Sequence, residues 1–125
     1  MTVLPEEVSK AWEKREKPVV FTTVDPDGIP NAIYATCVSY YNHEAIIVAN
    51  NYFNKTMANI QSGSTGSILF ITKDNESYQI KGTIEYHEQG PVFEDMKNWN
   101  PAQHPGHGAA LVRIEEVYKG SQKLV

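Results

Sequence analysis

The residues with the clearest capacity for chemistry lie at the start of a short predicted helix over residues 53–61. Asn54, Lys55 and Thr56 open this segment directly after an apolar stretch. The first turn of a helix leaves backbone N–H groups unpaired and carries a partial positive charge, so it suits an anion such as phosphate. Lys55 adds a cation and Thr56 a hydroxyl donor, while Asn54 can cap the helix. A phosphate site is therefore one interpretation, and a simple helix cap is the other.

Two histidines form a second candidate group. His104 and His107 lie in the segment 100–108, which is rich in proline and glycine and is predicted to be a loop. Their spacing would allow both to bind one metal ion, but no third Cys, His or acidic residue lies nearby in the sequence. We therefore predict no metal site and favour a solvated loop, with haem ligation kept as an alternative.

Other reactive residue types give no catalytic pattern. The only cysteine, Cys37, has no neighbouring cation to activate it, so it is interpreted as a strand residue rather than a nucleophile. The acidic pairs at 6–7 and 115–116 are adjacent in sequence, and adjacent side chains point to opposite faces of a strand. Hydrolytic chemistry is not indicated, and we assign no catalytic residue.

Composition excludes several classes of protein. The chain has 125 residues, a formal net charge of -4 and one cysteine. The absence of a clustered basic run argues against a nucleic-acid surface, and the chain has no apolar run long enough to cross a membrane. The segment 1–17 lacks the apolar core of a secretory signal, so we expect a cytoplasmic protein with no membrane or nucleic-acid partner.

Apolar periodicity predicts a mainly β protein with short peripheral helices. Segments rich in β-branched and aromatic residues are separated by turn residues such as those at 25–28, a pattern typical of antiparallel strands. About six strands, without a helix between successive strands, favour an antiparallel split β-barrel in a single domain over residues 1–125. The predicted strands are 19–24, 30–41, 45–49, 67–72, 78–86 and 109–117, and the predicted helices are 5–14, 53–61 and 92–99.

Three segments carry a family resemblance. Residues 19–30, with their Asp-Gly-x-Pro turn, residues 54–60 and residues 109–117 together resemble the FMN-binding split-barrel proteins related to pyridoxamine 5'-phosphate oxidase. The resemblance implies that the cofactor is FMN and that Lys55 and Thr56 contact its phosphate. It also implies a homodimer with the flavins between the subunits, and a loop 100–108 that approaches the partner's flavin.

The same resemblance implies where the rest of the flavin lies. The second predicted strand would run along the ring, and two asparagines before the helix would lie beside the ribityl chain. An extended backbone can match the polar edge of a flat ring with its N–H and C=O groups. The implied residues are Ile33, Tyr34, Ala35, Thr36 and Cys37 for the ring, and Asn50 and Asn51 for the ribityl chain.

The sequence also departs from the family pattern. The carboxyl end, residues 119–125, lacks the tryptophan and arginine signature of true pyridoxamine 5'-phosphate oxidases, so vitamin B6 oxidation is not expected. We expect an FMN-dependent oxidoreductase or electron carrier. The alternatives are a haem-binding or haem-degrading split barrel, based on His104 and His107, a non-catalytic flavin-binding module, and a deazaflavin in place of FMN.

Overall fold

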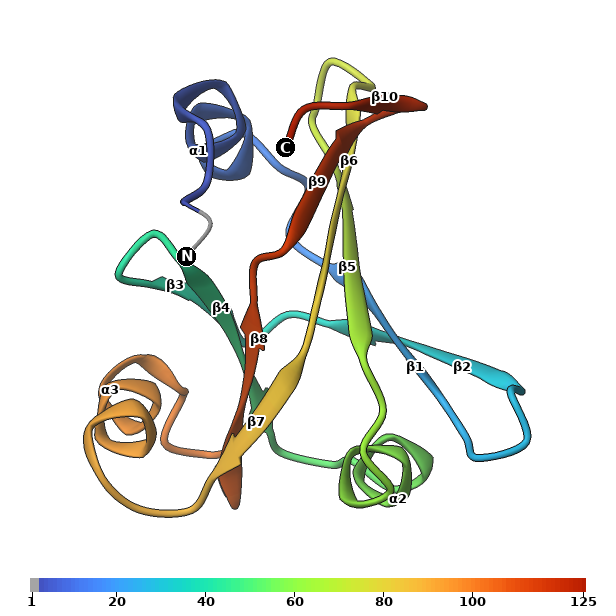
Figure 1. Ribbon diagram of the computed structural model, residues 1–125. Helices are drawn as coiled ribbons and strands as arrows, with labels where there is room; N and C mark the ends of the chain where they lie inside the picture. The colour runs from blue at the N-terminus through green and yellow to red at the C-terminus, as the bar shows by residue number, and fades with distance from the viewer. Residues whose placement is uncertain (1–2) are drawn as a thin grey trace.

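The computed structural model of the chain describes residues 3–125, so residues 1 and 2 of the predicted domain lie outside the described residues. Over this range the protein is mostly β, with ten strands and three helices. The strands form two antiparallel sheets that face each other across the core (Figure 1). Within residues 3–125, no helix has the length and apolar character needed to cross a membrane. The predicted antiparallel split barrel is confirmed.

The larger sheet has the strand order β10-β9-β6-β5-β1-β2. Its strands are β1 (Val19–Val24), β2 (Pro30–Ala35), β5 (Gly66–Ile71), β6 (Ser77–Gly82), β9 (Glu116–Lys119) and β10 (Gln122–Lys123). Burial alternates along β1: Val19, Phe21 and Thr23 are buried, and each is followed by a partly exposed residue. Because this alternation of burial has a period of two residues, one face of the sheet points into the barrel and the other face lies outside.

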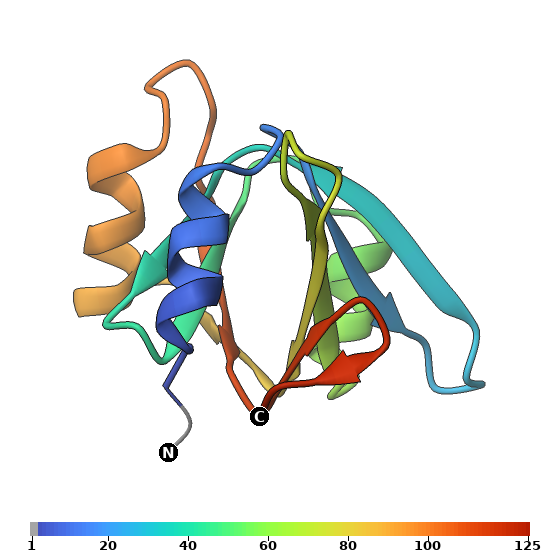
Figure 2. The ribbon, with the colours of Figure 1, turned by 90° about the horizontal axis from the view of Figure 1, so that it is seen from above.

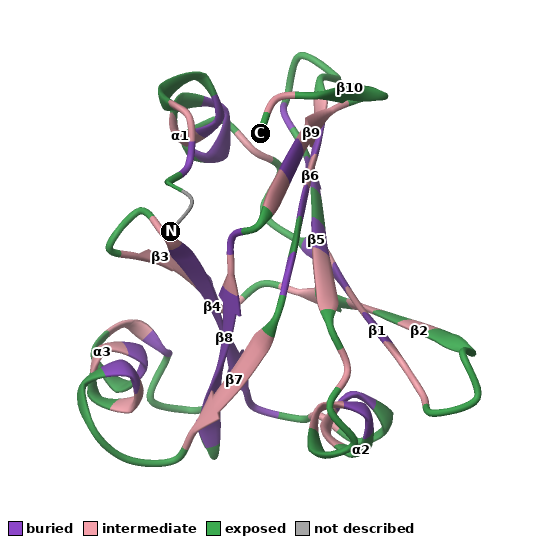
Figure 3. Cartoon of the chain, viewed as in Figure 1, coloured by how far each residue is buried: buried purple, intermediate pink, exposed green. Residues whose placement is uncertain are grey.

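The smaller sheet has the order β3-β4-β8-β7. Its strands are β3 (Val38–Tyr41), β4 (Ala45–Asn50), β7 (Ile84–His87) and β8 (Gly108–Arg113). Every residue of β4 is buried, as the purple ribbon in Figure 3 shows, so both faces of this strand are covered. One face contributes to the barrel core, and the other packs with Met96 of helix α3 (Pro91–Trp99).

The count of about six strands was too low, because three predicted strands are each divided between the two sheets. Residues 30–41 divide into β2 and β3, residues 78–86 into β6 and β7, and residues 109–117 into β8 and β9. A Cβ on Gly82, at the end of β6, would collide with the carbonyl oxygen of Arg113, at the end of β8. The backbones at the ends of these two strands therefore pack directly against each other. The short β10 was also not predicted.

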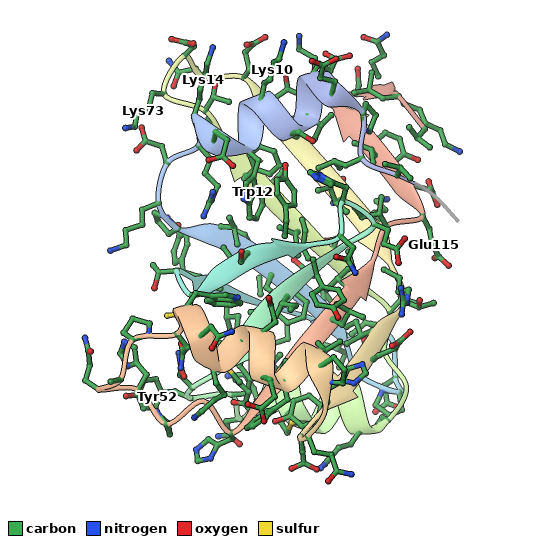
Figure 4. The ribbon with its side chains drawn as sticks, turned by 90° about the vertical axis from the view of Figure 1, so that its left-hand side faces the viewer. Lys10, Trp12, Lys14, Tyr52, Lys73 and Glu115 are labelled. Atoms are coloured by element: carbon green, nitrogen blue, oxygen red, sulfur yellow. The ribbon has the colours of Figure 1, made fainter. Side chains whose placement is uncertain are left out.

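The helices close the barrel and cover the smaller sheet. Helix α1 (Glu6–Glu13) packs on the barrel, and its Trp12 points inward from the helix (Figure 4). The Trp12 ring lies 5.1 Å from Tyr40 of β3 and 5.2 Å from Phe70 of β5, so it bridges the two sheets. Figure 2 shows α1 and α3 on the side away from β1 and β2.

Helix α2 (Lys55–Gln61) lies at another end of the barrel and contacts β1, β2 and β7. It follows β4 after a short connection, and it ends before Gly63, whose φ of 88° is the left-handed conformation common after a helix. Because β4 is fixed in the core, the start of α2 is held beside strand β2.

Candidate functional site

Strand β2 is an edge strand, and this arrangement creates the site. The strand pairs with β1 along one side only. The other edge of an end strand carries backbone N–H and C=O groups with no ladder partner, and such groups can bind another molecule. Two residues, Thr36 and Cys37, follow β2 and connect it to β3 of the smaller sheet.

A cleft of about 300 Å³ opens beside this edge. It brings together six of the predicted site residues, namely the run from Ile33 to Cys37 and Asn51. The lining residues are Ile33, Tyr34, Ala35, Thr36, Cys37, Ala49, Asn51, Tyr52, Phe53 and His104. Tyr34 is 79% exposed and Tyr52 is 72% exposed, so two aromatic side chains stand at the open side of the cleft.

Asn50 is not among the residues that line the cleft. It is buried, its Nδ2 donates to the Tyr86 hydroxyl at 2.8 Å, and its Oδ1 accepts from the Phe53 N–H at 3.0 Å. Burial raises the pKa of Tyr86, which keeps the hydroxyl neutral. The structure therefore gives Asn50 the task of fixing the turn between β4 and α2.

Asn54 occupies the N-cap position of α2, as predicted, but its side chain does not cap the helix. The side chain makes no capping hydrogen bond, and its backbone has φ -133° and ψ -83°. A capping residue usually has an extended backbone, which turns its side chain toward the free N–H groups of the first turn. The conformation of Asn54 does not provide that orientation.

Lys55 and Thr56 have different environments. Thr56 is only 1% exposed, and its Oγ1 accepts a hydrogen bond from Asn31 Nδ2 at 3.1 Å. Lys55 is exposed and lines a second cleft of about 260 Å³. The other residues of this second cleft are Asp25, Ile29, Pro30, Asn31, Ala58 and Asn59. Seven of the ten predicted site residues thus line one of two clefts, which lie at opposite ends of the same strand, β2, whereas Asn50, Asn54 and Thr56 line neither.

The sequence did not single out Asn31 and Tyr52 of these clefts, and it gave no sign that Tyr52 contacts His104. Asn31 links β2 to α2, while Tyr52 and His104 form one wall of the first cleft. The Tyr52 hydroxyl lies 3.1 Å from His104 Nδ1, and the two rings meet edge to face with centroids 5.6 Å apart. Figure 4 shows Tyr52 at the end of the molecule near the loop that follows α3. The only sequence signal was the His104 side chain itself.

The two histidines have different surroundings. His104 is half-buried and lines the cleft, which differs from the expectation of a solvated loop residue. His107 is exposed. Over residues 3–125, no group of three His, Cys, Asp or Glu side chains could hold a metal ion.

The chemical character of the first cleft fits a flat ring with a polar edge. Backbone groups of the β2 edge offer donors and acceptors, and Ile33, Ala35 and Phe53 supply apolar surface. Lys55 and Asn31 at the second cleft supply a cation and an amide suited to an anionic group. An elongated ligand with a ring at one end and an anion at the other matches this distribution.

The two-sheet barrel and the cleft at its edge strand define a split-barrel protein, and the comparisons identify its family. The pyridoxamine 5'-phosphate oxidase family model matches residues 4–119. The chain therefore belongs to this family.

Individual relatives agree with this assignment. The protein MJ0282 of Methanocaldococcus jannaschii is 29% identical over 121 residues, which cover 92% of this chain and 79% of the relative. HupZ of Group A Streptococcus has a similar fold, with a TM-score of 0.81, 20% identity and coverage of 95% of this chain and 94% of HupZ. An FMN-binding protein of Syntrophomonas wolfei has a TM-score of 0.75, 19% identity and coverage of 93% and 96%.

Proposed function

We propose that this protein is an FMN-binding flavoprotein that acts as an oxidoreductase or an electron carrier. The observation that carries the proposal is the cleft along the free edge of β2, which gathers the run from Ile33 to Cys37 with Asn51. When bound, FMN supplies the redox chemistry, and the protein's role is to bind and orient the ring and to limit access of water. No side chain is required as a general acid.

In this proposal, the ring lies along β2. The backbone from Ile33 to Cys37 hydrogen-bonds the polar edge of the ring, and Phe53 contacts its apolar surface. Asn51 lies toward the ribityl chain. Asn50 supports the same region indirectly, because it fixes the turn that carries Asn51 and Phe53.

The phosphate is placed at the opposite end of β2. Lys55 is the exposed cation at the second cleft, and Asn31 holds the Thr56 hydroxyl beside it. Because the Thr56 oxygen already accepts from Asn31, its O–H is free to donate to an anion. Asn54 is exposed next to Lys55 and would contact the phosphate through its side chain rather than cap the helix.

Assembly as a homodimer is part of the proposal. Val20 pairs with Tyr34 on one side and with Leu69 on the other, so these three side chains form a row on the outer face of the larger sheet. Leu69 is 42% exposed, and both α1 and α3 lie on the other side of the molecule. A second copy against this face would cover the row and the exposed side of the cleft.

The cellular location proposed is the cytoplasm. Cys37, the single cysteine, is free and partly exposed, which suits a reducing compartment. Low-identity structural relatives include a protein named F420 reductase, so a deazaflavin is the main competitor to FMN as the ligand.

Haem binding is a second candidate, favoured by the position of His104 on the cleft wall. In that case, adding haem would give a shifted Soret band that His104→Ala abolishes and His107→Ala retains. A band that survives His104→Ala would exclude this residue as the ligand.

The visible absorption spectrum of the purified protein, followed by mass analysis of the released cofactor, tests the proposal. We expect flavin bands and the mass of FMN. A deazaflavin or haem would each give a different spectrum and mass, and either result would replace FMN. Turnover with NADH or NADPH and simple acceptors then distinguishes an oxidoreductase from a non-catalytic flavin module.

A further inference from the structure

We propose that Asn51 and Asn100 are positioning residues, whose buried amide pair fixes the loop 100–108 so that His104 meets Tyr52 at the wall of the cleft. Asn51 is 7% exposed and Asn100 is 9% exposed. Asn51 Nδ2 donates to Asn100 Oδ1 at 3.0 Å, and Asn100 Nδ2 donates to Asn51 Oδ1 at 2.9 Å. The inference rests on the proposed function, since the ligand concerned is FMN.

The Asn51 side chain uses its hydrogen-bonding capacity on this loop. Besides the bond from Asn100, its Oδ1 accepts from the Gly106 N–H at 2.9 Å. One amide therefore holds both the beginning and the end of the loop. Aspartate at this position would keep the acceptors but lose the donor, and leucine would lose both.

Further contacts hold the loop close to the amide pair. The His107 N–H donates to the Asn50 carbonyl at 2.9 Å, and Lys97 Nζ donates to the Pro105 carbonyl at 3.1 Å. Gly106 has a φ of 54°, and a Cβ there would lie 2.9 Å from Asn100 Nδ2. The loop backbone thus lies directly against the pair, with no room for a side chain between them.

The chain connects this amide pair to the cleft. Asn51 immediately precedes Tyr52, and Asn100 lies four positions before His104 in the loop. Fixing Asn51 to Asn100 therefore brings Tyr52 and His104 to the separation of 3.1 Å between hydroxyl and Nδ1. If the Tyr52 hydroxyl donates, the neutral imidazole carries its hydrogen on Nε2, so His104 presents a donor in a defined orientation.

His104 lies where this orientation matters. Besides the cleft along β2, it lines a neighbouring cleft of about 340 Å³ that also includes Thr36 and Cys37. A ligand in either cleft meets the imidazole. The amide pair therefore acts on ligand binding through His104, without contact between Asn100 and the ligand.

The variant Asn100→Asp provides a test with a reversible signature. As a carboxylate, the introduced side chain still accepts from Asn51 Nδ2 but cannot donate to Asn51 Oδ1, so one of the two hydrogen bonds is lost and two oxygen atoms face each other. As a neutral carboxylic acid, the same side chain can both donate to Asn51 Oδ1 and accept from Asn51 Nδ2, which restores the pair. Burial favours the neutral form of a carboxyl group, so the restoration is expected within the acidic range in which the protein stays folded.

Two quantities are measured for wild type and Asn100→Asp at pH 8 and in that acidic range, with folding checked by circular dichroism. They are the imidazole NMR signals of His104 and the affinity for added FMN. At pH 8 we expect the variant to show displaced His104 signals and about tenfold weaker FMN binding, the cost of one unsatisfied buried polar group. In the acidic range both should return to the wild-type values measured there.

Asn59→Asp is the matched control. Asn59 is a buried asparagine on α2 whose Nδ2 donates to Thr23 Oγ1 at 2.9 Å, remote from the loop in sequence. Because Asn59 also lines the second cleft, where the phosphate is proposed to bind, this control is compared by stability, which should fall, and by the His104 signals, which should stay in place, and not by FMN affinity. Equal displacement of the His104 signals by both variants, or no displacement and no pH-dependent recovery in Asn100→Asp, would overturn the positioning role.

The NMR signals also separate this inference from the proposed function. If wild type fails to bind FMN while Asn100→Asp still displaces the His104 signals reversibly, the FMN proposal fails and the positioning role of the pair stands. If FMN binds and the signals do not respond, only the positioning role fails.

Discussion

Asn31 of β2 and Thr56 of α2 are joined by a hydrogen bond of 3.1 Å from the Asn31 amide to the Thr56 hydroxyl oxygen. This bond ties the edge strand of the larger sheet to the start of the helix. The backbone proposed to bind the flavin ring and the residues proposed to bind its phosphate therefore belong to one connected unit. Binding at either end should depend on the other.

The double substitution Lys55→Ala, Thr56→Ala should weaken FMN binding by about 10-fold to 100-fold, since a hydrogen bond to a charged group contributes roughly 1.5–3 kcal/mol. Riboflavin, which lacks the phosphate, should bind Lys55→Ala and wild type alike, because this single variant keeps the hydrogen bond between Asn31 and Thr56. Fluorescence titration of both ligands measures the difference. Unchanged FMN affinity in a folded double variant would show that the phosphate binds elsewhere. The single variant Lys55→Ala separates the loss of the cation from the loss of the buried Thr56 hydroxyl.

Gly82→Ala should destabilise the protein severely, by about 3 kcal/mol or more, because its Cβ would collide with the Arg113 backbone. Gly66→Ala is the matched control. Its Cβ would lie 2.8 Å from Ile84 Cδ1, the end of a side chain that can rotate, so a smaller loss is expected. Urea unfolding of both variants provides the comparison, and equal losses would contradict the close backbone packing at Gly82.

The ion pair between Glu85 and Arg113 predicts a pH-dependent contribution to stability. Arg113 Nε lies 2.7 Å from Glu85 Oε2, and this hydrogen bond lowers the pKa of Glu85 below its ordinary value of 4.5. A carboxyl group with a lowered folded-state pKa stabilises the fold above its unfolded-state pKa, and this contribution is lost as pH falls through the folded-state pKa.

Glu85→Gln should therefore lower stability at pH 6, modestly because the pair is partly exposed. The difference from wild type should shrink as the pH falls below about 4.5. Thermal unfolding of both proteins across this range measures it. A difference that stays constant down to the acid unfolding limit would show that the Glu85 charge is not responsible.

Leu69→Arg should shift the proposed homodimer toward monomer, because it introduces a charge into the apolar row on the outer face of the larger sheet. Asn98→Arg, on the exposed side of α3, adds the same side chain on the opposite side of the molecule. Sedimentation velocity should show dimer for wild type and Asn98→Arg. A monomeric wild type, or a dimer that tolerates Leu69→Arg, would argue against this interface.

The positions of the strands followed from local sequence, but their division between sheets did not. Runs such as 19–24 are rich in β-branched and aromatic residues, and each became a strand. The crossing at Thr36 and Cys37 has no glycine or proline to signal it. It results from the packing of two sheets around a common core, which is not encoded in a short window of sequence.

The candidate site was predictable to a similar extent. The run from Ile33 to Cys37 was placed by family resemblance, and it lines one cleft. The contact between Tyr52 and His104 joins residues 52 positions apart, so no local spacing could reveal it. The role of Asn54 was wrong for a different reason, since a capping residue type does not ensure the backbone conformation that capping requires.

Titration of the cofactor-free protein with FMN tests the central claim most directly. Binding should quench the flavin fluorescence with a dissociation constant of about 1 μM or lower and one FMN per chain. Wild type should prefer FMN over riboflavin, and Lys55→Ala should reduce that preference. Absence of quenching by FMN at about 100 μM, with the protein folded, would contradict the assignment of the cleft as a flavin site.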